Sequence, residues 1–94
     1  MYRHIVLTKL YDGADDADFL EVVHRLVDLG SEPGIIYWKV NESIDTRKGA
    51  IIVTDAAFVD EAAFEAFKIS EAHKEAGEFI KNVADWWVGD YLED

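Results

Sequence analysis

The sequence contains no cysteine, one proline and one methionine, and only nine of its residues are lysine or arginine. The absence of cysteine excludes disulfides, thiolate metal sites and cysteine nucleophiles. No apolar run is long enough to cross a bilayer. The first ten residues also lack the architecture of a signal peptide, because their apolar run is short and Lys9 interrupts it. We therefore expect a soluble, cytoplasmic protein.

The charge of the chain is strongly acidic, with 20 acidic residues and a formal net charge of −11. Such a surface repels the phosphates of nucleic acids and of anionic membranes, so neither is an expected partner. The six glycines are scattered along the chain and form no phosphate-binding loop. Nucleotide binding is therefore not indicated.

The 94 residues, of which 50% are hydrophobic, match the size of one small domain spanning residues 1–94. Alternating and amphipathic patterns predict strands over residues 2–10, 35–40, 50–58 and 85–92. They predict one helix from about residue 15 to Gly30, with an apolar stripe of Phe19, Val23, Leu26 and Val27. Further helices are expected after Asp60 and after Ser70, either of which can cap a helix.

This order, strand-helix-strand twice, predicts an α+β ferredoxin-like βαββαβ sandwich with a four-stranded antiparallel sheet. The helices cover one sheet face, yet the strands carry apolar side chains on both. The strand pattern places Ile35 and Tyr37 opposite Ile36 and Trp38. A second copy packed sheet against sheet would cover the other face, which predicts a homodimer burying on the order of 1,200–2,000 Å².

Several segments resemble one known family. Residues 3–10 (RHIVLTKL) resemble the first strand of the stress-responsive A/B-barrel family, also called the dimeric α/β-barrel family. Residues 32–35 (EPGI) resemble its entry into the second strand, and residues 67–73 and 87–91 resemble its helix motif and closing strand. The likeness runs from Tyr2 to about Leu92. It implies a ferredoxin-like protomer and a barrel made of two facing sheets.

The resemblance also implies candidate site residues. The family includes stress proteins, bacterial members of unknown role, and a plant polyketide cyclase that uses no metal or organic cofactor. That cyclase uses a helix histidine, a tyrosine six positions earlier and a histidine on the first strand. The matching positions here are His73, Phe67 and His4, so the phenol is absent. The family's His-Pro pair is Ser70-Glu71 in this chain.

The residues themselves point to His73 as a general base, because it shares an apolar helix face with Ile80 and an imidazole takes a proton near neutral pH. His4 is a possible second group, on the same strand face as Val6. The alternative is that His73 simply bonds Ser70 or a backbone carbonyl. The predicted ligand pocket consists of Phe67, Phe64, Ile80 and Val6, although such residues also serve as core or dimer interface.

Other polar residues are interpreted as ordinary. His24 lies among charged residues on a solvated helix face. Asp55 would be a buried carboxylate if its strand is central, but we expect it near the end of the strand and exposed to water. The three histidines make no metal signature, since none are spaced as i and i+4. We expect neither a metal nor a cofactor.

Three functions stay open at this point. The first is a small dimeric stress-type protein that binds a small apolar ligand or has no catalytic activity. The second is a cofactor-free cyclase, lyase or isomerase that acts on an apolar carbonyl compound with His73 as base. The third, from fold analogy alone, is a cofactor-independent monooxygenase. A cavity between helix and sheet that both His73 and His4 reach would favour the enzyme.

Overall fold

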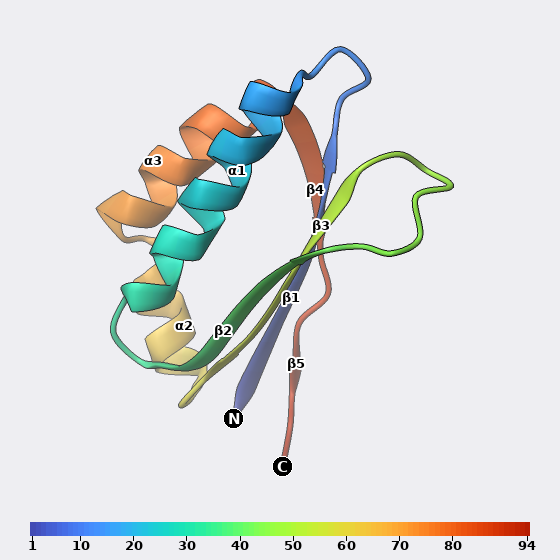
Figure 1. Ribbon diagram of the computed structural model, residues 1–94. Coiled ribbons are helices and arrows are strands. Elements are labelled where there is room, and N and C mark those ends of the chain that lie inside the picture. Colours follow the sequence, from blue (N-terminus) through green and yellow to red (C-terminus); the bar gives the residue numbers. More distant parts are fainter.

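The computed structural model describes residues 1–94 and has a sheet covered on one face by helices (Figure 1). The predicted α+β ferredoxin-like architecture is confirmed. The elements in chain order are β1 (Tyr2–Leu10), α1 (Asp16–Asp28), a 3-10 turn (Leu29–Ser31), β2 (Ile35–Glu42), β3 (Ile51–Phe58), α2 (Glu61–Lys68), α3 (Glu71–Ile80), β4 (Ala84–Val88) and β5 (Tyr91–Leu92).

The sheet has the strand order β2-β3-β1-β4, with β5 pairing the start of β1, and every pairing is antiparallel. β3, which is apolar on both faces, lies between β2 and β1, as expected for such a strand. The register pairs His4 with Ala56 and Thr8 with Ile52. Even-numbered residues of β1 and β3 therefore face the helices, and odd-numbered residues face away from them.

Each helix begins at a side chain that caps its first turn. The Asp15 carboxylate accepts from the backbone N–H of Asp18, and the Asp18 side chain accepts from that of Asp15. Asp60 and Ser70 cap α2 and α3, as predicted, each accepting from the backbone N–H three residues further on. None of the helices has both the length and the apolar character that a membrane span requires.

The core lies between the helices and the sheet, and α1 contributes to it through Val22 and Leu26. The predicted stripe was wrong at Val27, which is 52% exposed. Positions 22, 26 and 29 follow one another at spacings of four and three, so they form one face of the helix and its terminal turn. Val27 lies about 100° around the helix from Leu26 and therefore faces solvent.

β2 contains a bulge that changes which residues share a face. The register jumps between Ile35, which pairs with Phe58, and Tyr37, which pairs with Ala57. Two residues of β2 thus correspond to one step of β3. Ile35 and Trp38 consequently pack on the helix side, whereas Tyr37 faces outward. The predicted grouping of Ile35 with Tyr37 was wrong, because a one-residue shift exchanges the faces of a strand.

The last predicted strand, residues 85–92, is interrupted at Gly89 and Asp90. β4 pairs with the second half of β1, and β5 pairs with Tyr2 and Arg3. The interruption brings the C-terminal segment beside the N-terminus (Figure 1). It also places Asp90 beside β1, with consequences for the site.

Candidate functional site

A cavity of about 90 Å³ lies between the helix-facing side of the sheet and the helices. Nine of its 14 lining residues are hydrophobic, so its walls are mainly apolar. The polar side chains among them are two histidines and two threonines. They come from separate elements: His4 and Thr8 from β1, Thr54 from β3 and His73 from α3. The two histidines singled out in the sequence therefore reach the same cavity.

His4 is held in an aromatic environment on the helix side of β1. Its side chain is 8% exposed. Its ring centre lies 4.9 Å from that of Phe64, 6.1 Å from Phe67 and 6.3 Å from Trp38. These rings exclude water from the imidazole, and packing on several sides fixes its orientation.

Asp90 orients the His4 ring. The carboxylate oxygens of Asp90 lie 2.9 and 3.1 Å from Nδ1 of His4. Asp90 also accepts from the Tyr2 hydroxyl at 2.7 Å and from the backbone N–H of Ile5 at 3.2 Å. A carboxylate with these neighbours acts as an acceptor, which assigns the imidazole proton to Nδ1. The Nε2 of His4 is then left with a free lone pair.

His73 occupies the first turn of α3. Its backbone N–H donates to Oγ of the capping residue Ser70 at 3.2 Å, and that hydroxyl donates to the Phe67 carbonyl at 2.8 Å. The bond to Ser70 thus involves the backbone of His73 and leaves its imidazole free to line the cavity. The ring stands edge-on to Phe67, with ring centres 5.0 Å apart. Phe67 therefore packs against both histidines.

Both imidazoles are neutral at neutral pH. Burial lowers the pKa of His4 below its ordinary value of 6.5, although the charge of Asp90 opposes this shift. Burial also lowers the pKa of His73, and the nearby His4 and Lys68 add to the effect. The contact of His4 with Asp90 is accordingly a hydrogen bond to a carboxylate rather than an ion pair. Two neutral imidazoles in one apolar cavity can each accept a proton.

Tyr2 completes this arrangement as a hydrogen-bond donor. Burial and the bond to Asp90 raise the pKa of Tyr2 well above its ordinary value of 10. The phenol therefore stays protonated and keeps donating to the carboxylate. Its ring stacks on Phe64 at 4.4 Å, which anchors the hydroxyl.

The residues predicted to form the ligand pocket are placed as follows. Phe67, Ile80 and Val6 line the cavity. Phe64 does not line it: this residue lies in the core between His4 and the stacked ring of Tyr2. His24 is exposed on α1, away from the other two histidines. No group of three or more histidine, aspartate and glutamate side chains gathers as metal ligands would.

Asp90, Tyr2 and Thr54 belong to the site but were not recognised in the sequence. The pair Gly89-Asp90 inside an otherwise apolar segment is a turn signal that indicates a break in the strand. The contact of Asp90 with His4 follows only from the pairing of β5 with the start of β1. That pairing joins residues 88 and 90 positions apart in the chain, so no local pattern reveals it.

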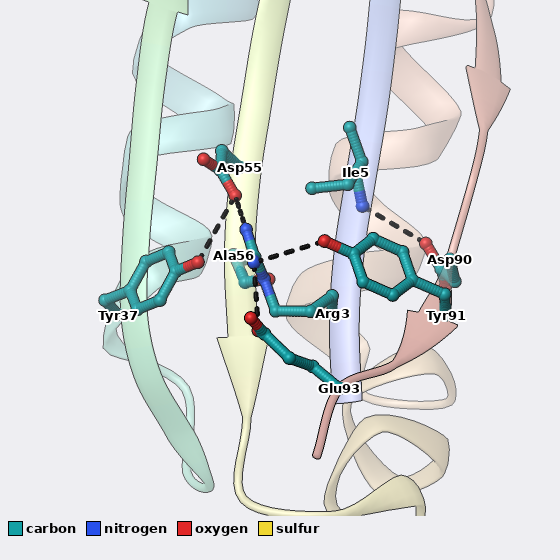
Figure 2. A network of polar contacts seen from close by, with 8 residues as sticks. All are labelled: Arg3, Ile5, Tyr37, Asp55, Ala56, Asp90, Tyr91 and Glu93. Atoms are coloured by element: carbon teal, nitrogen blue, oxygen red, sulfur yellow. Dashed lines mark hydrogen bonds and ion pairs between the residues drawn. The ribbon is translucent and has the colours of Figure 1, made fainter. Parts of the chain in front are cut away.

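The outward face of the sheet carries a separate polar cluster around Arg3 (Figure 2). The Arg3 guanidinium bonds Asp55 at 2.5 Å, Glu93 at 3.1 Å and the Tyr91 hydroxyl at 3.3 Å. The Tyr37 hydroxyl also contacts Asp55, at 3.5 Å. Asp55 lies inside β3 and is paired with Arg3, so its interpretation as an ordinary residue near a strand end was wrong.

Beyond this cluster the outward face carries several exposed apolar side chains, with Lys9 and Lys48 beside them. Leu7 of β1 and Trp87 of β4 are paired neighbours that remain 42% and 55% exposed. Val53 lies opposite Leu7 on β3, and Ile51 lines the same shallow surface as Leu7 and Trp87. Large side chains exposed together in this way are typical of an interaction surface.

Solved structures with the same fold cover nearly the whole chain. A hydroxynitrile lyase from Passiflora edulis is 20% identical, with a TM-score of 0.82 and coverage of 99% of this chain and 93% of that one. A dimeric ferredoxin-like protein of unknown function from Thermobifida fusca is 18% identical, with a TM-score of 0.85 and coverage of 98% and 90%. SnoaB, a cofactor-independent oxygenase from Streptomyces nogalater, is 15% identical, with a TM-score of 0.79 and coverage of 99% and 92%.

These likenesses establish the fold, and two of the similar structures are described as dimeric. No curated protein is similar enough in sequence to count as a relative. The model of one family, described as the stress responsive A/B barrel domain, matches residues 2–92. This match spans almost the whole chain, as the resemblance of its segments predicted. The chain therefore belongs to the stress-responsive A/B-barrel domain family.

Proposed function

We propose that the protein is a cofactor-free enzyme that moves a proton at a carbon next to a carbonyl group, as a lyase, cyclase or isomerase does. The observation that carries this proposal is the shared cavity of His4 and His73. Both imidazoles are neutral near pH 7, and the remaining walls are mainly apolar. Such a site favours a small, largely apolar carbonyl compound.

His4 is the better placed base of the two. Its Nδ1–H is bound to Asp90, so Nε2 presents a lone pair to the cavity side of the ring. When Nε2 takes a proton from the carbon of the substrate, the electron pair of the C–H bond moves onto the carbonyl oxygen and forms an enolate. The Asp90 carboxylate stabilises the imidazolium that results. Asp90 is thus a positioning residue that acts through His4.

His73 is suited to the complementary role. No carboxylate fixes the tautomer of its ring, so one ring nitrogen can donate a hydrogen bond to the enolate oxygen. The sequence had suggested the reverse assignment, with His73 as base and His4 as the second group. The Asp90 contact supports the exchange of roles, because it prepares His4 to accept a proton and to hold it.

Two of the similar structures are named as enzymes, and one of them is a lyase. One is named a hydroxynitrile lyase and the other a cofactor-independent oxygenase. At 20% and 15% identity their likeness concerns the fold, so they support the proposal without assigning a substrate. The oxygenase alternative rests on that likeness alone, whereas the acid–base alternative also has the geometry of His4, Asp90 and His73 in its favour.

Proton exchange in a simple ketone tests the proposal without knowledge of the natural substrate. Butanone is incubated with the protein in D₂O, and loss of the α-proton signals is followed by ¹H NMR. We expect the wild type to accelerate exchange, and His4→Gln to reduce the enzymatic rate by about 10²- to 10⁴-fold, the usual contribution of a general base. His73→Gln should also slow exchange, while the exposed His24→Gln serves as the matched control.

Exchange no faster than with the same concentration of free imidazole would contradict the proposal. Undiminished exchange in His4→Gln would contradict the role of His4. Saturable ketone binding without exchange would favour the alternative of a ligand-binding protein that lacks catalytic activity.

We further infer that two protomers pair through their outward sheet faces. The exposed Leu7 and Trp87 supply an apolar centre, and the Arg3 cluster beside them is already paired internally. The ion pairs of Arg3 with Asp55 and Glu93 form within one protomer, which offsets part of the cost of burying that surface. The dimeric descriptions of similar structures support this assembly. An interface of standard size would bury about 1,200–2,000 Å² in total.

A further inference from the structure

Thr54 presents a buried hydroxyl group that has no partner. The residue is 1% exposed and lies in the middle of β3, opposite Val6 of β1 and Val40 of β2. Its Oγ1 makes no hydrogen bond with any other group of the protein. A buried hydroxyl without a partner costs free energy relative to an apolar group of the same shape. Valine has nearly that shape and suits a strand equally well.

Thr54 is the one polar residue on the helix-facing side of β3. The other helix-facing residues of β3 are Ile52, Ala56 and Phe58, and each of them is apolar and fully buried. Packing of the core therefore calls for an apolar side chain at position 54. Thr54 is one of the residues that line the cavity shared by the two histidines. The residue that carries the unpaired hydroxyl therefore lies in the wall of that cavity.

We propose that Thr54 determines specificity: its hydroxyl pairs with an oxygen of the bound molecule other than the carbonyl oxygen at the histidines. The ligand class is then a small ketone or aldehyde that carries a second oxygen function, such as a hydroxyl group. This inference rests on the proposed function in placing the carbonyl group beside His4 and His73.

The spacing along the sheet supports a second, separate polar contact. Val6, which lies opposite Thr54, follows His4 by two residues on the same face of β1. That step corresponds to about 7 Å along a strand. A single carbonyl oxygen cannot fill both positions, whereas a short chain with oxygen atoms at two places can. Thr8 and Thr54 are the only hydroxyl-bearing residues among those lining the cavity, and most of the other lining residues are apolar. The apolar remainder of the ligand would therefore contact those other walls.

Equilibrium binding of two matched ketones tests the inference. The probes are butanone and 4-hydroxybutan-2-one, titrated into the protein and followed by amide chemical-shift changes in NMR. We expect the wild type to bind the hydroxyketone about two- to tenfold more tightly than butanone, the effect of one added hydrogen bond. Thr54→Val should abolish this preference, and Thr54→Ser, which keeps the hydroxyl group, should retain it.

The stability of the free protein gives a second readout. Thr54→Val removes an unpaired buried hydroxyl group, so its Tm should equal or exceed that of the wild type, whereas Thr54→Ser should lower the Tm. The inference would be overturned if the wild type bound the two ketones equally, or if it showed no saturable binding of the hydroxyketone. A preference for the hydroxyketone that survives in Thr54→Val would overturn it as well. Because binding is measured rather than turnover, a protein that exchanges no α-protons can still show the preference, and the two proposals fail separately.

Discussion

The Asp90 carboxylate accepts hydrogen bonds from His4, from Tyr2 and from the backbone of Ile5. These three donors come from one end of β1, whereas Asp90 lies in the short connection between β4 and β5. The carboxylate therefore fixes the tautomer of His4 and ties the last segment of the chain to the first. At the scale of single residues, the orientation of His4 in the site depends on its hydrogen bond to Asp90.

Asp90→Asn should reduce α-proton exchange while leaving the protein folded. The amide is nearly isosteric with the carboxylate but carries no charge, so it stabilises the His4 imidazolium less. The expected loss is of the same order as that for His4→Gln, and the double variant should lose little more than either single variant. Exchange rates of the single and double variants are compared, with the exposed Asp85→Asn as control. Full activity of Asp90→Asn would contradict the role assigned to Asp90.

The two histidines also make stability depend on pH. Their pKa values in the folded chain are lowered by burial, whereas in the unfolded chain they return to about 6.5. Below 6.5 the unfolded state thus binds more protons than the folded state, and stability falls as the pH decreases. The Tm of the wild type should decline from pH 7 toward the lowered pKa values. In the double variant His4→Gln, His73→Gln the Tm should depend less on pH over this range. The same dependence of Tm on pH in the variant and the wild type would contradict buried neutral imidazoles.

At the scale of elements, the start of α3 positions one half of the site. Ser70 ends the turn after α2, caps α3 and bonds the backbone of both Phe67 and His73. The side chain of Phe67 packs against the two imidazoles. A single hydroxyl group therefore fixes the position of the His73 backbone relative to that of Phe67, which forms part of the cavity wall.

Ser70→Ala should destabilise the protein by about 1 kcal/mol, within the 0.5–2 kcal/mol typical of a lost N-cap. It should also slow α-proton exchange, because the first turn of α3 frays and His73 loses its fixed position. Urea unfolding and the exchange assay measure the two effects. Ser43→Ala, in the connection between β2 and β3, is the control and should change neither. An unchanged free energy of unfolding in Ser70→Ala would show that the cap is unimportant.

The elements themselves were largely predictable because local signals determine them. Asp60 and Ser70 are cap residues that mark helix starts, and the alternation of β1 correctly grouped His4 with Val6 on one face of the strand. The bulge at Ile36 and the break at Asp90 were missed. Both depend on how a strand meets its partner, and pairing across the sheet leaves only weak traces in the sequence of one strand.

The candidate site was predictable to a lesser degree. His4 and His73 were singled out by the family resemblance, by residue type and by their apolar neighbours, and the structure brings both to one cavity. Asp90, the partner of His4, and Tyr2, which bonds Asp90, come from the opposite ends of the chain. Because long-range pairing creates these contacts, no spacing of residues in the sequence encodes them.

At the scale of the whole molecule, the two faces of the sheet have different roles. The helix side holds the core and the cavity, and the outward side exposes an apolar centre around Leu7 and Trp87. The Arg3 cluster, shown in Figure 2, lies on the same outward side. Arg3 and His4 are consecutive residues of β1 that serve opposite faces. Pairing of two protomers through the outward face would therefore restrain the strand that carries His4.

Leu7→Glu should convert the proposed dimer to a monomer. The substitution places a charge at the centre of the apolar surface, and burying that charge in an interface costs desolvation free energy. Light scattering coupled to gel filtration at micromolar concentration measures the mass of the wild type and the variant. Leu20→Glu on the exposed side of α1 is the control and should leave the dimer intact. A monomeric wild type at this concentration would refute the proposed assembly.

The central claim is that His4 is neutral, protonated on Nδ1 and held by Asp90 in a cavity that it shares with His73. Long-range ¹H–¹⁵N correlation spectra of the imidazoles test this most directly, because they report the tautomer and the protonation of each ring. We predict the Nδ1–H tautomer for His4 at pH 7 and pKa values below 6.5 for both His4 and His73. A His4 ring that is protonated on both nitrogens at pH 7, or protonated on Nε2 alone, would contradict the account.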